Sequence, residues 1–347
     1  MEPEQEIKKK SPAGLIIAII LLLAALGALG YFGYNFYSEE VTKQELWEAT
    51  AKARITPLPT SMVPTPEPTP EVPEEPTPTP VPTIAPEDML PNDNLQSAFA
   101  CMIRKSDGQA LLNKNMDDRM YPASMVKILT TIVALENLPD LLMEVQVLQQ
   151  DIDPGYLAGA SMAGFSAFET VRVLDLLFGA MLPSGADACL TLARAVSGSE
   201  AAFVELMNEK AIEIGLQGSH FTNVTGLHDE NQYTTCHDMA MLMQYCMENT
   251  DFRNIVATSV FTTIPTELHP QGITLYSTVY EGFAETTFAN GAVFLGGKTG
   301  TTEEAGRCLV SAATFYGEEY YLVTAMARGE TPGNFEDTAL IYSELTR

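Results

Sequence analysis

A run rich in proline, threonine and glutamate occupies residues 56–86 and divides the chain into parts of different composition. Its sequence is TPLPTSMVPTPEPTPEVPEEPTPTPVPTIAP. The run lacks the apolar side chains that a packed core needs, and its prolines favour an extended polyproline II conformation that rises about 3.1 Å per residue. We therefore predict a disordered stalk over residues 56–92 and one large packed domain over residues 93–347.

The segment before the stalk has the composition of a membrane anchor. Residues 11–38 contain no charged side chain, and about 20 apolar residues suffice to cross a bilayer. Three lysines end residues 1–10, so these residues form the predicted cytoplasmic tail, followed outside by a juxtamembrane segment over residues 39–55. A cleaved signal peptide is the alternative, with Ala28-Leu29-Gly30 as its cleavage site. We favour a single-pass anchor in the cell membrane because the apolar run exceeds a signal peptide's usual core.

The charge and the cysteines exclude two classes of function. A formal net charge of −26 argues against a nucleic-acid partner, because binding the phosphate backbone needs a basic patch. The cysteines lack the paired short spacings of a zinc motif, so we expect no metal site. Most of them lie in apolar runs and are expected to be small buried side chains. The five are Cys101, Cys189, Cys236, Cys246 and Cys308.

The domain over residues 93–347 has strand patterns near both ends and helix patterns between them. Residues 97–104 and 109–113 predict one hairpin, and residues 307–316 and 320–327 predict a second. Helices are expected after Ser124 and over residues 170–182, 185–196, 200–214, 237–247 and 335–345. The order predicts an α/β protein of the α+β type, in which an antiparallel sheet built from both ends is flanked by helices and encloses a helical middle segment.

One lysine stands in an otherwise apolar helix pattern, YPASMVKILTTIVALE, residues 121–136. If Ser124 begins this helix, Lys127 lies nearly one turn later and can reach back toward the serine hydroxyl. Burial lowers the pKa of a lysine, which can then act as a neutral base. The spacing alone is weak evidence, because most lysines extend their charge into water.

Two further stretches strengthen the interpretation of Ser124 and Lys127. In MLPSGADA, residues 181–188, Ser184 and Gly185 open a helix, although such a serine is often only a helix cap. In GGKTGTTEEAGRCLV, residues 296–310, two glycines precede Lys298-Thr299-Gly300 and a predicted strand. By itself this is an ordinary glycine-rich turn.

Together, the three stretches resemble the Ser-x-x-Lys, Ser-x-Asn and Lys-Thr-Gly motifs of penicillin-recognising serine enzymes. The chain is most similar to the D-alanyl-D-alanine carboxypeptidases among the low-molecular-mass penicillin-binding proteins. The resemblance extends over nearly all of residues 93–347, including TNVTGLHDENQYTTCHDMAMLM at residues 222–243. It implies the β-lactamase-like fold of the penicillin-binding proteins, peptidoglycan stem peptides as substrates, β-lactam antibiotics as covalent inhibitors, and no cofactor.

The resemblance also assigns a role to each motif residue. Ser124 is the nucleophile that attacks the carbonyl between two terminal D-alanines, and Lys127 takes its proton. Ser184 passes a proton to the leaving D-alanine, and Gly185, the next residue, binds the substrate. The terminal carboxylate is bound by Lys298 and Thr299 of the Lys298-Thr299-Gly300 motif, and the backbone N–H groups of Ser124 and Thr301 form the oxyanion hole. The TGLHD loop that contains His228 is expected to be structural only.

Two positions depart from the family pattern. Ala186 stands where the second motif ends in asparagine, and the loss of that carboxamide predicts an enzyme slowed about tenfold to hundredfold. Asn334 stands where many relatives place an arginine near the substrate carboxylate, and Arg328 is the nearest cation that could compensate. These departures motivate the alternative of a binding module or poorly catalytic pseudoenzyme.

Two other hydrolase classes fit the sequence less well. A class A β-lactamase needs a glutamate in a separate loop, and no Glu-x-x-x-Asn stretch lies between the second and third motifs to supply one. A Ser-His-Asp hydrolase of the α/β class needs a Gly-x-Ser-x-Gly elbow, which is absent around Ser124. The carboxypeptidase therefore remains the first expectation.

Overall fold

The computed structural model describes residues 90, 94–283, 285–328 and 332–346. The predicted cytoplasmic tail, anchor and juxtamembrane segment, and almost all of the stalk, lie outside these residues. Among the helices of the described ranges, none combines the length and the apolar character that crossing a bilayer requires.

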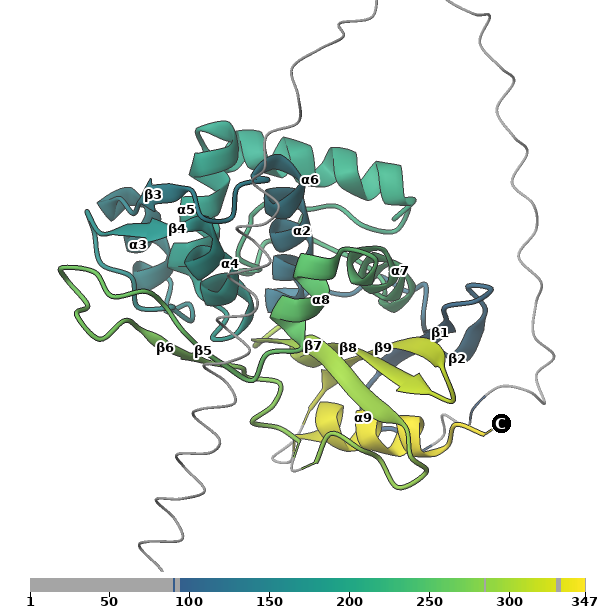
Figure 1. The fold of residues 1–347 in the computed structure, drawn as a ribbon. Coiled ribbons are helices and arrows are strands. Elements are labelled where there is room, and N and C mark those ends of the chain that lie inside the picture. The colour runs from purple at the N-terminus through teal and green to yellow at the C-terminus, as the bar shows by residue number, and fades with distance from the viewer. Residues whose placement is uncertain (1–89, 91–93, 284, 329–331, 347) are drawn as a thin grey trace, which may run out of the picture. The chain divides into compact units, whose positions relative to one another are not determined.

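A five-stranded antiparallel sheet forms the framework of the domain (Figure 1). Its spatial order is β2 (Ala110–Lys114), β1 (Phe99–Arg104), β9 (Glu318–Ala327), β8 (Gly306–Phe315) and β7 (Val293–Thr302). The first hairpin, β1–β2, pairs with β9, so the two ends of the domain meet inside one sheet. Both predicted hairpins and the predicted antiparallel sheet are confirmed.

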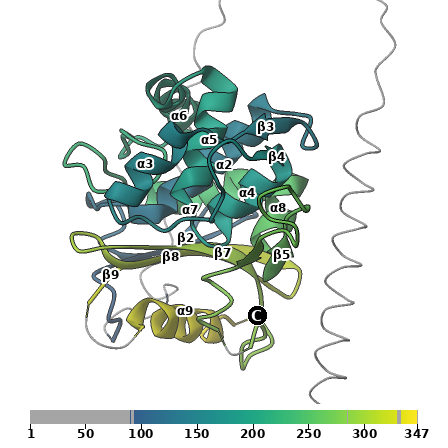
Figure 2. The ribbon, with the colours of Figure 1, turned by 90° about the vertical axis from the view of Figure 1, so that its left-hand side faces the viewer.

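The two faces of the sheet are covered differently. Figure 2 shows α9 (Gly333–Ser343) against one face and the other helices against the opposite face. Side chains alternate accordingly along β1: Met102 joins a buried cluster with Tyr342 of α9, whereas Ile103 lines a pocket with Met241 of α7 (Cys236–Met247). A strand covered on both faces is apolar at consecutive positions, which explains the unbroken apolar run in its sequence.

The middle of the chain is helical, as predicted. Its remaining helices are α2 (Lys127–Asn137), α3 (Gln149–Leu157), α4 (Val173–Met181), α5 (Ala186–Ser197), α6 (Glu200–Ile214) and α8 (Thr250–Val256). The ends of α6 follow from its sequence. Ser199 accepts a hydrogen bond from Ala202 N at the start, and Gly215 ends the helix with φ +92°, a conformation that a glycine adopts without strain.

The predicted helix over residues 170–182 begins too early. Residues Thr170–Arg172 form strand β4, which pairs with β3 (Glu144–Gln146), and only then does α4 begin. A second short pair joins β5 (Val260–Thr262) to β6 (Thr274–Tyr276). Strands of three residues show too little alternation to be distinguished from a helix in the sequence.

Candidate active site

Ser124 and Lys127 lie together at the start of the first long helix of the domain. Ser124 belongs to a 3-10 turn over Ala123–Val126, and Lys127 is the first residue of α2. The Lys127 Nζ atom lies 3.0 Å from Ser124 Oγ. Because the lysine side chain is only 2% exposed, it does not extend into water. The predicted approach of the amine to the hydroxyl is confirmed.

The TGLHD loop closes over this turn. Gly226 has φ +82°, and a Cβ atom there would overlap the Ala123 carbonyl, so only glycine fits. Asn223 Oδ1 accepts hydrogen bonds from Thr225 N and Gly226 N at 3.2 and 2.8 Å and fixes the loop. Lys127 Nζ donates to the Thr225 carbonyl. The loop therefore contacts the lysine directly through its backbone.

Strand β7 brings the third motif to Ser124. Lys298 pairs with Val310 in the sheet, and a Cβ atom at Gly300 would lie 3.1 Å from Ser124 N. The motif glycine is therefore needed for this close approach. Lys298 is completely buried, and its Nζ donates to the Thr299 carbonyl at 2.9 Å. Thr301 is exposed beyond the motif.

Ser184 of the second motif has an unusual conformation. It is buried with φ +67°, a region that a residue with a side chain adopts only under strain. Its hydroxyl has no hydrogen-bond partner within the described part of the chain. A buried, unpartnered hydroxyl in a strained backbone is typical of a functional site.

Thr278 joins the second motif to the third. Its N–H donates to the Leu182 carbonyl at 3.1 Å, and its Oγ1 lies 2.6 Å from Thr299 Oγ1. The sequence gives no sign of this threonine, because the loop that carries it has no motif of its own. The contact that identifies Thr278, the short hydroxyl pair with Thr299, forms only when the chain folds.

Two buried amines give the site its electrostatic character. Burial lowers the pKa of Lys127, although the nearby Cys189 and Asp187 act in the opposite direction. Burial also lowers the pKa of Lys298, well below its ordinary value, and the positive charge of Lys127 lowers it further. Since like charges repel, the pair favours a state in which one of the two amines is neutral.

The two sequence departures have different structural settings. Ala186 is fully buried at the start of α5, and a Cβ atom on Gly155 of α3 would lie 2.8 Å from the Ala186 Cβ. Asn334 is buried in the first turn of α9, where its Nδ2 donates to the Cys308 carbonyl at 3.3 Å. Asn334 thus bonds to the sheet from the face covered by α9. Arg328 donates to the Glu304 carbonyl.

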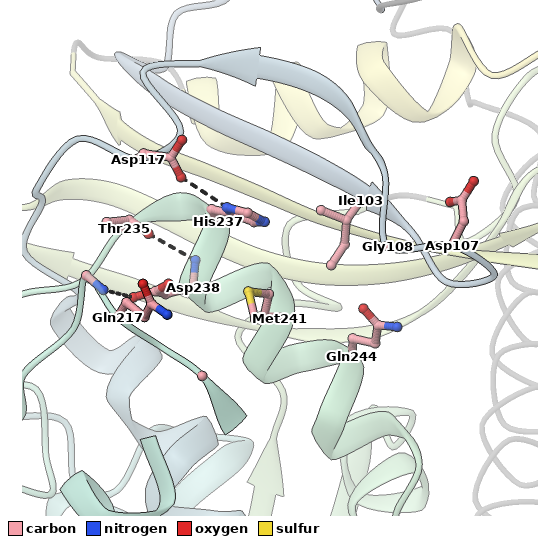
Figure 3. Close-up of a pocket in the computed structure, with 12 residues that line it drawn as sticks. Ile103, Asp107, Gly108, Asp117, Gln217, Thr235, His237, Asp238, Met241 and Gln244 are labelled. Atoms are coloured by element: carbon pink, nitrogen blue, oxygen red, sulfur yellow. Dashed lines mark hydrogen bonds and ion pairs between the residues drawn. The ribbon is translucent and has the colours of Figure 1, made fainter. Parts of the chain in front are cut away.

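A cavity of about 580 Å³ lies elsewhere, between the β1–β2 turn and α7 (Figure 3). Asp117 and His237 face each other there at 3.0 Å, but none of the three motifs lines it. Within the described ranges, no group of three or more histidine, cysteine or acidic side chains could hold a metal ion. All five cysteines are free and buried, as expected of small apolar side chains.

The assembled groups suit acyl transfer to a serine. Ser124 offers a hydroxyl, and an amine with a lowered pKa lies within hydrogen-bond reach of it. Ser184 offers a second hydroxyl with a free hydrogen-bonding capacity. Lys298 supplies a second buried amine, whose charged form an anionic ligand would stabilise.

Known proteins resemble this chain over most of the domain. A family model described as D-alanyl-D-alanine carboxypeptidase, peptidase family S11, matches residues 86–328. The D-alanyl-D-alanine carboxypeptidase of Streptomyces sp. (strain K15) is 32% identical over 244 residues, which cover 68% of this chain and 82% of that protein.

A second curated relative matches over a shorter length. The carboxypeptidase DacF of Bacillus subtilis (strain 168) is 35% identical over 147 residues, 42% of this chain, and the match spans only 38% of that protein. Among solved structures, the Streptomyces K15 DD-transpeptidase superposes with a TM-score of 0.64 at 26% identity, covering 73% of this chain and 99% of that one. The resemblance includes the fold as well as the sequence.

Proposed function

Because the chain belongs to the D-alanyl-D-alanine carboxypeptidase family, peptidase S11, we propose that it removes the terminal D-alanine from peptidoglycan stem pentapeptides. The reaction proceeds through an acyl-enzyme on Ser124. The observation that carries this function is the 3.0 Å approach of the buried Lys127 amine to the Ser124 hydroxyl. β-Lactam antibiotics, which are also acyl donors with a carboxylate, react at the same hydroxyl.

Acylation begins with proton transfer to Lys127. The Ser124 oxygen attacks the carbonyl carbon between the two D-alanines, and its proton moves to Lys127 Nζ. Negative charge then develops on the carbonyl oxygen, where the backbone N–H groups of Ser124 and Thr301 stabilise it. In a comparable hydrolase, one such donor contributes about 2.7 to 4 kcal/mol. Lys298 and Thr299 bind the terminal carboxylate and fix the peptide against Gly185 and Gly300.

Collapse of the tetrahedral intermediate breaks the C–N bond. The leaving amine nitrogen needs a proton, which Ser184 delivers from Lys127, and the free D-alanine departs. Water then attacks the Ser124 ester, releases the shortened peptide and restores the hydroxyl. The unpartnered Ser184 hydroxyl supports this assignment, because a relay oxygen must be free to bond to the substrate.

The direct test is D-alanine release from a peptidoglycan pentapeptide that ends in Lys-D-Ala-D-Ala. The purified protein should release D-alanine, and the matched variant Ser124→Ala should release none. A labelled penicillin should bind covalently to the wild-type protein and not to the variant. A folded protein that releases no D-alanine would refute the carboxypeptidase function.

Ala186→Asn tests whether the missing carboxamide slows the reaction. Restoring the amide should contribute about 1 to 3 kcal/mol of interaction with the substrate. The space beside Ala186 is narrow, however, because a Cβ atom on Gly155 would lie 2.8 Å from Ala186 Cβ and 3.1 Å from Met162 Sδ. Overpacking of a filled space costs about 1 to 3 kcal/mol. We therefore expect kcat/KM to change less than about threefold in the single variant and to rise about tenfold in Ala186→Asn with Met162→Ala.

The four-variant cycle, completed by Met162→Ala alone, separates the two effects. A hundredfold gain in the single variant Ala186→Asn would mean that the space beside Ala186 is free. An unchanged rate in the double variant would mean that this enzyme makes no use of a carboxamide at residue 186. Thermal unfolding of each variant checks that the comparison is made on folded protein.

A further inference from the structure

A segment of backbone over residues 161–165, here named the strap, lies directly on the second motif. The N–H of Ala186 donates to the Ser161 carbonyl at 2.8 Å. A Cβ atom at Gly185 would lie only 2.7 Å from Ala163 N. The strap and the motif are therefore in backbone-to-backbone contact, and glycine is required at residue 185.

Asp187 holds the strap in this place. Its Oδ1 accepts a hydrogen bond from Ala163 N at 2.8 Å, and its Oδ2 accepts from Gly164 N and Phe165 N at 2.9 and 3.1 Å. The side chain is completely buried. Hydrogen bonds to an ionised carboxylate are stronger than those between neutral groups, so this one side chain fixes three consecutive peptide units.

The motif held by the strap is the part of the site under strain. Ser184 has φ +67°, a left-handed conformation that is unfavourable for a residue with a side chain. Such a conformation persists only where the surrounding structure enforces it. The strap contacts Gly185 and Ala186, the residues that follow Ser184, and Asp187 anchors the strap. Asp187 and the strap therefore enforce the left-handed conformation of Ser184 from its C-terminal side.

We propose that Asp187 is a positioning residue that, by anchoring the strap to the second motif, holds the Ser184 hydroxyl free and directed toward the leaving group. The inference rests on the proposed function, in which Ser184 delivers a proton to the departing amine. It adds a residue that touches no substrate and positions Ser184 through the backbone. Loss of the Asp187 carboxylate lets Ser184 relax, and its hydroxyl then turns to a partner in the protein.

The proposal predicts a defect that depends on the leaving group. An amine must be protonated as the C–N bond breaks, whereas the thiolate of a thioester leaves without a proton. In Asp187→Ala, kcat for the D-alanyl-D-alanine peptide should fall about tenfold to hundredfold, as expected for a misplaced group. For the matching thioester, in which thioglycolate replaces the terminal D-alanine, kcat should change less than about threefold.

Two further variants serve as references. Ser184→Ala should show the same preference for the thioester. Asp151→Asn changes another buried carboxylate, which binds Arg194 and Thr191 of α5. It should lower the melting temperature without changing the ratio of the two rates. Asp187→Asn keeps the size of the side chain and replaces Asp187→Ala if the latter fails to fold.

The pH dependence of the acylation rate is a further measurement, and a general loosening of the fold would not change it. The negative charge of Asp187 raises the pKa of Lys127, against the effect of burial. Asp187→Asn should therefore shift the acidic limb of the acylation profile to lower pH. Suppose that the Asp187 variants lower kcat equally for the peptide and the thioester, while Ser184→Ala lowers it mainly for the peptide. The inference about Asp187 is then wrong, and the role of Ser184 stands. If Ser184→Ala slows the peptide and the thioester equally, both the role proposed for Asp187 and the role proposed for Ser184 are wrong.

Discussion

Replacing Lys127 by methionine should lower the rate of Ser124 acylation by about a thousandfold, in the range that removal of a general base produces. The Lys127 amine lies 3.0 Å from the Ser124 oxygen, and its burial lowers its pKa. It is therefore placed and poised to accept the proton that attack releases. The rate is best measured with a labelled penicillin, which reports the acylation step without product release.

The same variant should keep its fold. Methionine leaves the Thr225 carbonyl without the donor that Lys127 provides, which costs about 1 to 3 kcal/mol. It also removes an amine whose burial is unfavourable in the charged form, so the two effects oppose each other. Because the pKa of Lys127 is lowered on folding, the cost of burying its charge is largest at low pH and declines as pH rises. The melting temperature of Lys127→Met relative to the wild type should therefore improve toward acidic pH.

Lys210→Met provides the matched lysine control. Lys210 pairs with Glu136 and Glu213 at 2.8 and 2.6 Å, away from the three motifs. Its replacement should leave acylation unchanged. A Lys127→Met protein that is acylated at the wild-type rate would remove Lys127 from the mechanism.

The helices and strands predicted correctly are those whose sequence patterns are long and depend only on neighbouring residues. The hairpin β8–β9 has two runs of ten residues around a glycine-containing turn, and α6 has a capping serine and a terminating glycine. The three-residue strands β3 to β6 were not predicted, because their pairing depends on residues far apart in the chain. Thr170–Arg172 was therefore assigned to a helix, although it pairs with Glu144–Gln146.

The site shows the same division between local and non-local signals. The approach of Lys127 to Ser124 follows from their spacing on one turn, and so it could be predicted. The Thr225 carbonyl and the strap bound by Asp187 could not, because a backbone group carries no signature in the sequence. The bond from Asn334 Nδ2 to the Cys308 carbonyl could not be predicted either, because it joins a helix to a strand 26 residues earlier in the chain.

Lys298→Met should lower kcat/KM for the pentapeptide by about a hundredfold to a thousandfold, as expected when one partner of a buried charge pair is removed. Lys298 is completely buried, and burial together with the charge of Lys127 lowers its pKa. A substrate carboxylate at this position would act as its counter-ion and favour the charged form of Lys298. Repulsion between the two amines then favours a neutral Lys127, so binding of the carboxylate prepares the base.

A substrate with an amidated C-terminus distinguishes this role from a general loss of structure. The wild-type protein should lose about as much activity with the amide as Lys298→Met loses with the acid, because either change removes the same charge pair. The kcat/KM of Lys298→Met should fall little further with the amide, since the charge pair between Lys298 and the carboxylate is already absent. If Lys298→Met lowers kcat/KM by the same factor for the acid and for the amide, Lys298 does not bind the carboxylate. In that case its lowered pKa would reflect burial beside Lys127 alone, and the terminal carboxylate would have to be recognised by Thr299 and its partner Thr278.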